Sequence, residues 1–404
     1  MNYWQLVRKH PHDTIFGLLH YLFSCCGQSF FISLFVPAWI TSVNLDNAEF
    51  AKLYGMATLG GAVALSVVGP LIDRVRIKTF TLANGVLLAV CCFLLSQSQN
   101  WIMLGLSLTG IRLSAQGLMP LTGATAMGRY FEANRGKALS FATLGMSIGE
   151  LMAPTLIVIL LKQYDWSTVW IFISLAIITL FPISIMAFGR KEAKPNIEEK
   201  QTNKQNFKDN KAFIKRLRTS PSFLILAFMI VYTPFITAGF LINQNLIVDA
   251  MGLDLMWFAA AISSFGTCRI VTTIFTGPLV DRFTAQRIIP FTLLPLVIGM
   301  LAVLFSNHAY TLIFFMGMVG VSISFGSVAG SALWAELYGV DKMGTVKSQV
   351  STFMVFLTAL APVLFAYMFE IWFQTTFVLL ISIAIILMFA SHQVISQKSK
   401  LQSI

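Results

Sequence analysis

The hexapeptide GPLIDR at residues 69–74 returns, with one change, as GPLVDR at residues 277–282 of this 404-residue chain. The two copies lie 208 positions apart (277 minus 69), which is about half of the chain. The same spacing relates a second set of landmarks, a glycine and a proline that flank an apolar run: Gly136 and Pro154, then Gly344 and Pro362. Internal repeats on this scale define an architecture. The sequence therefore predicts two copies of one structural unit.

The composition indicates a membrane protein. Hydrophobic residues make up 56% of the chain and charged residues 11%, with a mean hydropathy of +0.76. Soluble domains carry roughly a quarter charged residues, and a soluble fold of this size has no room to bury so many apolar side chains. Lipid is therefore the expected surrounding of most of the chain.

Apolar runs of about 20 residues are long enough to cross a bilayer as helices. Backbone groups in lipid need hydrogen bonds within their own segment, which favours helices over strands here. We therefore predict an all-α membrane protein with twelve spans. They cover residues 15–41, 51–72, 78–96, 102–127, 136–161, 167–188, 222–248, 256–280, 287–306, 309–335, 345–369 and 372–391.

The basic residues predict the orientation, because lysine and arginine concentrate in cytoplasmic loops. Here they fall in both ends and in alternate loops, apart from Lys52 and Lys162 on the outer side and Arg112 and Arg269 inside apolar runs. Both termini are therefore expected in the cytoplasm. This placement explains the net charge of +11 without a nucleic-acid partner. The compact loops suggest a multi-pass protein of a bacterial inner membrane.

Enzyme chemistry has no support in the sequence. The five cysteines lie inside apolar runs, which is typical of small buried side chains and not of disulfides or metal ligands. The chain also carries no phosphate-binding glycine loop and no pairing of a nucleophile with a base. We therefore expect no enzyme activity, no cofactor and no metal, and we expect a monomer.

Residues 190–220 form the long polar stretch of the chain, rich in Lys, Asn, Gln and Glu. This composition is typical of a linker, and the stretch separates six spans from six. The expected organisation is an N-terminal half at residues 1–189, the cytoplasmic linker, and a C-terminal half at residues 221–404. Two repeats of six spans are typical of secondary transporters.

At these motifs the chain resembles the major facilitator superfamily. The loop from Gly69 to Lys78 resembles the family's glycine-x-x-x-aspartate-arginine signature, and residues 277–287 echo it. The segment from Arg112 to Gly117 resembles the arginine and glutamine-glycine pattern of span four in that family. Residues 129–138 resemble a loop of its organic-anion and monocarboxylate members. The resemblance covers essentially the whole chain, and it implies two six-helix halves around a central cavity, with transport by alternating access.

Two positions depart from branches of that family. Its drug exporters usually carry a glycine-proline signature in span five, where this chain has Gly149-Glu150. Its monocarboxylate branch usually has an acid and an arginine on span eight nearer the loop, whereas the charge in that span here is Arg269. The first departure argues against drug export, and the resemblance to the organic-anion branch is loose.

Three ionisable residues lie deep inside predicted spans: Arg112 in span four, Glu150 in span five and Arg269 in span eight. Each lies roughly 15–20 Å from one end of its span, at 1.5 Å per helical residue. Such residues are costly in a bilayer core and mark functional sites. A shift by the repeat length maps Arg112 onto Gly320 and Arg269 onto Gly61. The scaffold therefore repeats but the charges do not, as expected of substrate contacts.

The resemblance implies that spans four, five and eight face the central cavity. We therefore expect Arg112 and Arg269 to bind a small anionic substrate from opposite halves. A guanidinium suits a carboxylate because its planar fork donates two parallel hydrogen bonds. Glu150 is expected to load and release the proton that drives symport. The alternative is that Arg112 and Glu150 form a buried ion pair that only holds two spans together.

The repeated loops have a gating interpretation. The glycines allow close approach of helices, the carboxylates favour helix N-termini, and the arginines add ion pairs. These contacts are expected to close the cytoplasmic side of the transporter. The residues are Gly69, Asp73 and Arg74 in the first copy, and Gly277, Asp281 and Arg282 in the second. The alternative is that they only anchor the loops.

Weaker candidates for the substrate pathway are Gln28 on span one, Gln116 on span four and Tyr232 on span seven. Hydrogen bonding between helices is the commoner role of such residues. Glu336, near a span end, is expected to be solvated. The predicted function is transport of a small organic anion by proton symport. Transport of a larger metabolite, such as a siderophore or a drug-like compound, and a non-transporting receptor or scaffold remain alternatives.

Overall fold

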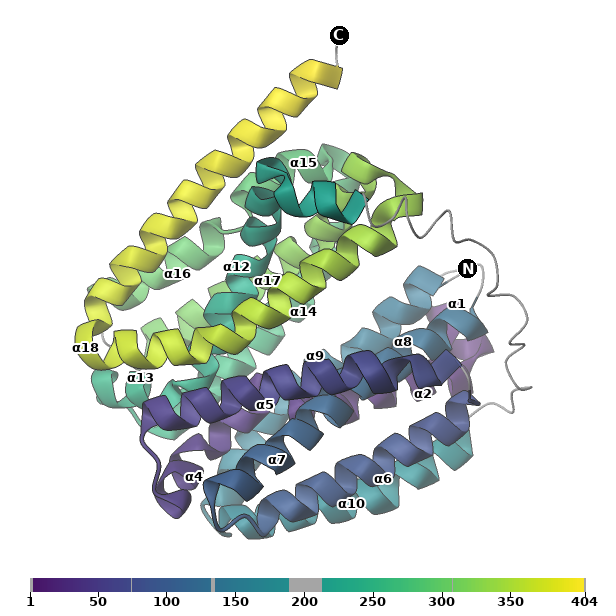
Figure 1. Ribbon diagram of the computed structural model, residues 1–404, viewed down its shortest axis with the longest axis vertical. Coiled ribbons are helices and arrows are strands. Elements are labelled where there is room, and N and C mark those ends of the chain that lie inside the picture. The colour runs from purple at the N-terminus through teal and green to yellow at the C-terminus, as the bar shows by residue number, and fades with distance from the viewer. Residues whose placement is uncertain (1–2, 74, 132–134, 189–212, 307, 403–404) are drawn as a thin grey trace. The chain divides into compact units, whose positions relative to one another are not determined.

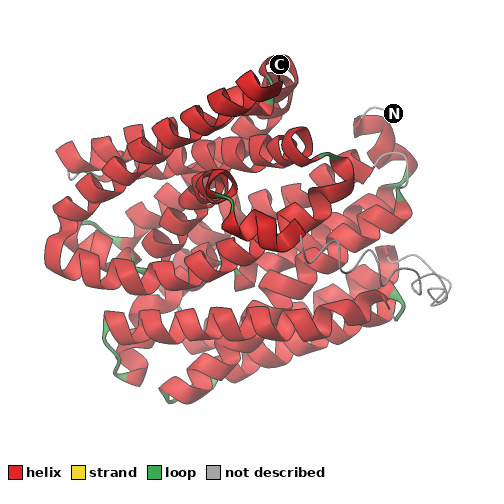
Figure 2. Cartoon of the chain, turned by 45° about the horizontal axis from the view of Figure 1, so that its top comes forward, coloured by secondary structure: helices red, strands yellow, loops and turns green. Residues whose placement is uncertain are grey.

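The protein is helical throughout its described regular structure. The computed structural model describes residues 3–73, 75–131, 135–188, 213–306 and 308–402, and within these ranges it contains helices and turns and no strand (Figure 2). The prediction of an all-α chain is thus confirmed for the described residues. The chain forms two compact units, Met1–Lys200 and Gln201–Ile404, and each is described by itself. Most of the expected linker lies outside the described residues.

The first unit contains one broken helix, one helix with an internal π-helical segment, and several long straight helices (Figure 1). Its elements are α1 (Tyr3–Lys9), α2 (Pro11–Phe23), η1 (Ser24–Gly27), α3 (Ser29–Ile32), η2 (Ser33–Phe35), α4 (Val36–Val43), α5 (Asn47–Val68), η3 (Gly69–Asp73), α6 (Ile77–Ser96), α7 (Trp101–Ile111), η4 (Arg112–Leu118), α8 (Met119–Tyr130), α9 (Arg135–Leu161) and α10 (Trp166–Phe188).

The second unit follows the same plan of long antiparallel helices (Figure 1). Residues 213–219 form a short helix at its start. Its elements are α12 (Pro221–Ile242), α13 (Gln244–Met251), α14 (Leu255–Phe283), α15 (Ala285–Ile288), η6 (Ile289–Phe291), α16 (Leu294–Phe305), α17 (Ala309–Tyr338) and α18 (Val340–Gln402).

Ten helices of the described chain are long and apolar enough to cross a membrane, or eleven if the bent pair Pro11–Gly27 and Ser29–Val43 counts as one span. The bend in this pair is 45°. The last two expected spans both fall within α18, where Trp372 has a non-helical backbone (φ −145°, ψ 65°). The exact count of twelve and the side of the termini stay predictions.

Short polar side chains explain where several of these helices begin. Asp46 and Glu49 form a capping box at the start of α5, with the Glu49 N–H donating to Asp46 Oδ1 at 2.7 Å. Asn100 caps α7 by accepting from the N–H of Met103 at 2.9 Å, and Asp254 caps α14. Each cap satisfies a backbone donor that has no partner inside its helix. Asp46, Asn100 and Asp254 thus serve as helix caps.

Glycines allow the helices within each unit to approach closely. Helices α6 and α10 lie side by side (Figure 1), and a Cβ on Gly85 of α6 would lie 2.5 Å from the Phe181 ring. Helices α2 and α9 also pack together, and a Cβ on Gly145 would overlap the carbonyl oxygen of Leu18. Small residues at such contacts are the usual packing device of membrane helices.

Large apolar side chains remain exposed on the outside of the units. Val67 is 71% exposed, Leu106 69%, Met186 72% and Phe389 68%. A water-soluble protein rarely tolerates so much exposed apolar surface. These side chains suit contact with lipid, which agrees with the composition.

The two copies of the repeated hexapeptide differ in local structure. The first forms the 3₁₀-helix η3 after α5, whereas the second continues inside α14 as far as Phe283. Thr284 then ends α14 with a positive φ of 68°, which a β-branched residue rarely adopts. The repeat therefore predicts the scaffold and not the backbone of each loop.

Candidate functional site

Arg112 opens a π-helical segment in the middle of a long helix. The segment η4 separates α7 from α8, and its wider turn lets the N–H of Met119 donate to the carbonyl of Ser114. Asn84 of α6 donates a second hydrogen bond to the same carbonyl oxygen, with Nδ2 at 3.2 Å. Such π-helical turns occur frequently at functional sites. The first arginine predicted from the sequence thus lies at an irregular point of its helix.

The guanidinium of Arg112 is held by neutral groups of the first unit. Its Nη1 donates to the carbonyl oxygen of Gly27 at 2.9 Å, and its Cζ lies 5.0 Å from the centre of the Tyr54 ring. Tyr54 is in turn hydrogen-bonded to Ser29, with 2.8 Å between the two oxygens. Arg112 is only 4% exposed, and its Nε has no hydrogen bond to any described residue. The charge is therefore stacked on an aromatic face without being neutralised by these contacts.

Two glycines create the space around Arg112. Gly27 ends the 3₁₀-helix η1 and packs against the backbone of η4, since a Cβ there would lie 2.9 Å from the amide nitrogen of Gln116. Gly61 of α5 packs on the other side, since its Cβ would lie 3.1 Å from Arg112 Cβ and 3.2 Å from the nitrogen of Leu113. The backbone of η1, where the first span is interrupted, is thus in close contact with the backbone of the π-helical segment η4.

Arg269 lies in α14 at the contact with α17. Its Cζ is 6.0 Å from the centre of the Phe265 ring, and its side chain is half-buried. Its carbonyl oxygen accepts a hydrogen bond from Ser324 of α17 at 3.0 Å. A Cβ on Gly320 would overlap the carbonyl oxygen of Phe265 and lie 3.3 Å from the nitrogen of Arg269. As in the first unit, the arginine lies opposite a glycine.

In the repeat, the arginine and the glycine of the contact exchange places between the two units. In the first unit α5 supplies the glycine and η4 supplies the arginine; in the second unit α14 supplies the arginine and α17 supplies the glycine. Each arginine thus lies beside the residue that corresponds to the other arginine. Each unit thus has one guanidinium at this helix crossing. In the first unit it is on the second helix of the pair, and in the second unit it is on the first.

Glu150 is buried in α9, with 3% of its surface exposed. Its neighbour Gly149 packs on the broken part of the first span, because a Cβ there would overlap the sulfur of Cys25. Arg112 and Glu150 therefore belong to segments that both pack on η1. The contacts of Arg112 with described residues do not include a salt bridge to Glu150.

The weaker candidates divide into two groups. Gln28 and Gln116 are half-buried; Gln28 directly follows η1, and Gln116 belongs to η4, which packs against η1. Neither amide makes a side-chain hydrogen bond to the described residues. Tyr232 is fully buried, and its hydroxyl donates to the carbonyl of Leu380 on α18 at 2.7 Å. This bond between helices is the alternative role considered for Tyr232, and it engages the hydroxyl inside the second unit.

The gating residues are only partly covered by the structure. Gly69 is buried, and a Cβ there would make an ordinary contact of 3.4 Å with Leu121. Arg282 is exposed and lies 5.2 Å from the Phe283 ring. The structure does not describe Arg74. It also does not describe the side chains of Asp73 and Asp281 or the burial of Gly277. Their gating role stays a prediction.

One buried histidine was not singled out by the sequence interpretation. His20 of α2 is fully buried; its Nδ1 lies 2.8 Å from the carbonyl oxygen of Phe16 and its Nε2 lies 3.2 Å from Thr81 Oγ1 of α6. A carbonyl only accepts, so Nδ1 carries a proton and Nε2 can accept from the hydroxyl. A lone histidine inside an apolar run was the available signal.

Glu336 also has a role that the sequence interpretation missed. It is exposed, as expected of a solvated residue, but its two carboxylate oxygens accept from the backbone N–H groups of Ala285 at 2.9 Å and Gln286 at 3.3 Å. The carboxylate therefore caps the start of α15 from the end of α17. No group of three or more histidine, cysteine, aspartate or glutamate side chains suited to a metal occurs among the described residues.

Solved structures of transporters share this fold. A bacterial homolog of the human lysosomal transporter Spinster, in an inward-facing and unoccupied conformation, aligns with 96% of this chain and 98% of its own, with a TM-score of 0.73 and 12% identity. A mutant of the nucleoside transporter NupG aligns with 95% of this chain and 99% of its own, with a TM-score of 0.71 and 11% identity. At these identities the likeness shows the fold alone.

Sequence comparison leads to the same family. The uncharacterized MFS-type transporter YhjX of Escherichia coli (strain K12) is 26% identical over 325 residues, which is 78% of either chain. The model of the Major Facilitator Superfamily matches residues 18–268 and 256–395. These matches cover most of the chain, including both arginines and both copies of the repeated loop. The chain therefore belongs to the Major Facilitator Superfamily and is a membrane transporter of this type.

Proposed function

We propose that this transporter moves a small organic anion of the carboxylate type by alternating access, with symport of a proton. The observation that carries the proposal is the pair of membrane-core arginines, each beside a glycine at the equivalent helix crossing of its own unit. The arginines themselves are not repeated between the units, which is expected of substrate contacts. The proposal includes action as a monomer in a bacterial inner membrane.

The surroundings of Arg112 favour an anionic cargo. Its partners among the described residues are a backbone carbonyl and an aromatic ring, neither of which carries a formal charge. A guanidinium in a membrane interior is stabilised most by an anion. A substrate carboxylate would accept two parallel hydrogen bonds from it. Gln116, on the same π-helical segment as Arg112, and Gln28, next to Gly27, would add neutral donors to the same substrate.

Glu150 supports proton coupling in this proposal. It is buried, and its helix packs on the same broken segment that Arg112 contacts through Gly27. Protonation of Glu150 would remove a negative charge near that segment and so favour entry of an anion. Release of the proton would favour release of the anion. The two events would then occur together, as symport requires.

A thermal-shift screen of the full-length protein against small carboxylates tests the substrate class. We expect some carboxylates to stabilise the wild type, and we expect Arg269→Ala to bind them about 10- to 100-fold more weakly, because it loses charged hydrogen bonds. Lys162→Ala is the matched control, since it also removes one positive charge but from an exposed loop. Equal binding by all three proteins would contradict the anion proposal.

Flux measurements separate the remaining alternatives. A carboxylate that stabilises the protein is added to proteoliposomes, and its uptake is followed under an imposed proton gradient. We expect uptake that depends on the gradient. Binding without flux would indicate a receptor or scaffold, and stabilisation by large amphipathic compounds alone would indicate a larger metabolite.

A further inference from the structure

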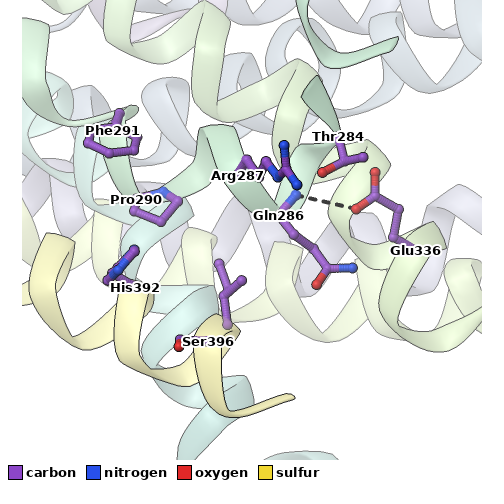
Figure 3. A pocket seen from close by; sticks show the side chains of 9 residues that line it. Thr284, Gln286, Arg287, Pro290, Phe291, Glu336, His392 and Ser396 are labelled. Carbon is purple, nitrogen blue, oxygen red and sulfur yellow. Dashed lines mark hydrogen bonds between the residues drawn. The ribbon is translucent and has the colours of Figure 1, made fainter. Parts of the chain in front are cut away.

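A cavity of about 820 Å³, lined by both polar and apolar side chains, lies on the second unit where α15 meets α17 and α18. Figure 3 shows Arg287 and Gln286 on one side, near Glu336 of α17, with His392 and Ser396 projecting from α18 across the cavity. Two of these side chains, Arg287 and His392, carry nitrogen atoms that can donate hydrogen bonds. Neither Arg112 nor Arg269 lines this cavity, so it is separate from the proposed substrate site.

An apolar groove of about 380 Å³ adjoins this larger cavity. Arg287 and Phe291 line both of them. The groove is otherwise lined mainly by apolar side chains, among them Phe283, which is 42% exposed, and Leu294, which is 44% exposed; Phe291 itself is 58% exposed. Arg287 therefore lies where the larger cavity and the apolar groove meet.

Arg287 is the group of the larger cavity that can attract a negative ligand. Both oxygens of Glu336 are engaged by the backbone N–H groups of Ala285 and Gln286, so this carboxylate is directed at the start of α15 (Figure 3). Arg287 is exposed and forms no salt bridge with any described residue. The guanidinium of Arg287 therefore remains available to a ligand from outside the chain.

We propose that this surface binds an anionic phospholipid. Its phosphate lies in the larger cavity against Arg287, with His392 as a second donor, and one of its acyl chains lies in the apolar groove along Phe283 and Leu294. Arginine suits a phosphate because its planar fork donates two parallel hydrogen bonds. The distribution of lysine and arginine assigns this end of the unit to the cytoplasm, and basic pockets on that side are suited to anionic headgroups.

The bound lipid would connect three parts of the second unit. Its headgroup would contact α15 at Arg287 and α18 at His392, beside Glu336 at the end of α17. Thr284, at the turn between α14 and α15, has a backbone conformation that is unfavourable for its residue type. A ligand that holds α15 against α18 would stabilise this turn. The lipid is therefore expected to raise the thermal stability of the protein.

The test uses the delipidated full-length protein in detergent and measures lipid retention by native mass spectrometry and the midpoint of thermal unfolding. The probes are phosphatidylglycerol, phosphatidylcholine and water-soluble glycerol phosphate. We expect phosphatidylglycerol to be retained and to stabilise the wild type more than the other two. Arg287→Ala should weaken this binding by about fivefold, since one basic residue near an anionic lipid contributes about that factor.

Two further variants make the result specific. Lys215→Ala removes one exposed positive charge from the same unit away from the cavity, and it should bind phosphatidylglycerol as the wild type does. Leu294→Trp fills the groove and should weaken lipid binding without changing the net charge. Equal binding of phosphatidylglycerol by wild type and Arg287→Ala would overturn the proposal. Stabilisation by glycerol phosphate alone would overturn it too, because it would identify the ligand as a soluble anion.

Discussion

Gly61 of α5 lies directly against Arg112 of η4: a Cβ on the glycine would be 3.1 Å from the Cβ of the arginine. Shifted by the repeat length, the same two positions are Arg269 and Gly320, which are also in contact. The helix crossing thus accommodates one large side chain because its partner has none. A guanidinium on both helices of one crossing would not fit without separating them.

Gly61→Ala should therefore disturb Arg112 more than it disturbs the fold. The added methyl group is within 3.2 Å of Arg112 and Leu113, so the neighbours must move by a few tenths of an ångström. We expect the affinity for a transported carboxylate to fall by about three- to tenfold, equivalent to ~1 kcal/mol, with a small loss of thermal stability. Gly128→Ala is the control, since nothing lies within 4 Å of a Cβ there. If Gly61→Ala binds the carboxylate with unchanged affinity, Arg112 does not take part in substrate binding.

Gly320→Ala should destabilise the second unit itself. Its methyl group would overlap the backbone oxygen of Phe265, which cannot rotate away as a side chain can. Overpacking of this kind costs about 1–3 kcal/mol. Gly326→Ala on the same helix is the matched control, because its nearest neighbour would be the carbonyl oxygen of Ile230 at 3.9 Å. Thermal unfolding in detergent measures both, and equal midpoints would show that α14 and α17 are not packed as described.

Arg112→Lys should reduce anion binding although it keeps the positive charge. The guanidinium both donates to the Gly27 carbonyl and lies over the Tyr54 ring, whereas an ammonium group lacks the planar fork that serves two acceptors at once. We expect a loss of about tenfold or more in carboxylate affinity. Tyr54→Phe keeps the ring and should retain most of the affinity. If Arg112→Lys binds the carboxylate with the affinity of the wild type, a positive charge alone is sufficient for binding.

The long helices could be predicted from the sequence because each is an apolar run between polar residues. Helix α6 covers Ile77–Ser96 against a predicted 78–96, and α9 covers Arg135–Leu161 against a predicted 136–161. The first span was predicted as one helix over 15–41, but it is interrupted at Ser24–Gly27. At that break η4 approaches Gly27 closely, and a contact between such distant parts of the chain leaves no local pattern.

The charged residues of the candidate site could be predicted from the sequence, but the groups that contact them could not. Arg112, Glu150 and Arg269 stand out because a charge in an apolar run has few structural explanations. The π-helical segment at Arg112 could not be recognised in the sequence, because it involves Asn84 of another helix, whose side chain donates to the Ser114 carbonyl. Tyr232 shows the alternative role of a polar residue in a span, since its hydroxyl donates to the carbonyl of Leu380, and its contact with substrate stays a prediction.

Glu150→Gln should uncouple transport from the proton gradient. The amide has nearly the shape of the carboxylic acid but cannot release a proton, so the site would remain in its neutral form at every pH. In proteoliposomes we expect exchange of a labelled carboxylate to persist, while accumulation driven by an imposed pH gradient is lost and the pH dependence of exchange is flattened. Glu370→Gln removes an exposed carboxylate near a span end and should behave as the wild type. A Glu150→Gln variant that still accumulates substrate with the original pH dependence would assign the proton to another group, and buried His20 would then be the next residue to test, because its Nε2 has a hydroxyl partner that can either donate or accept.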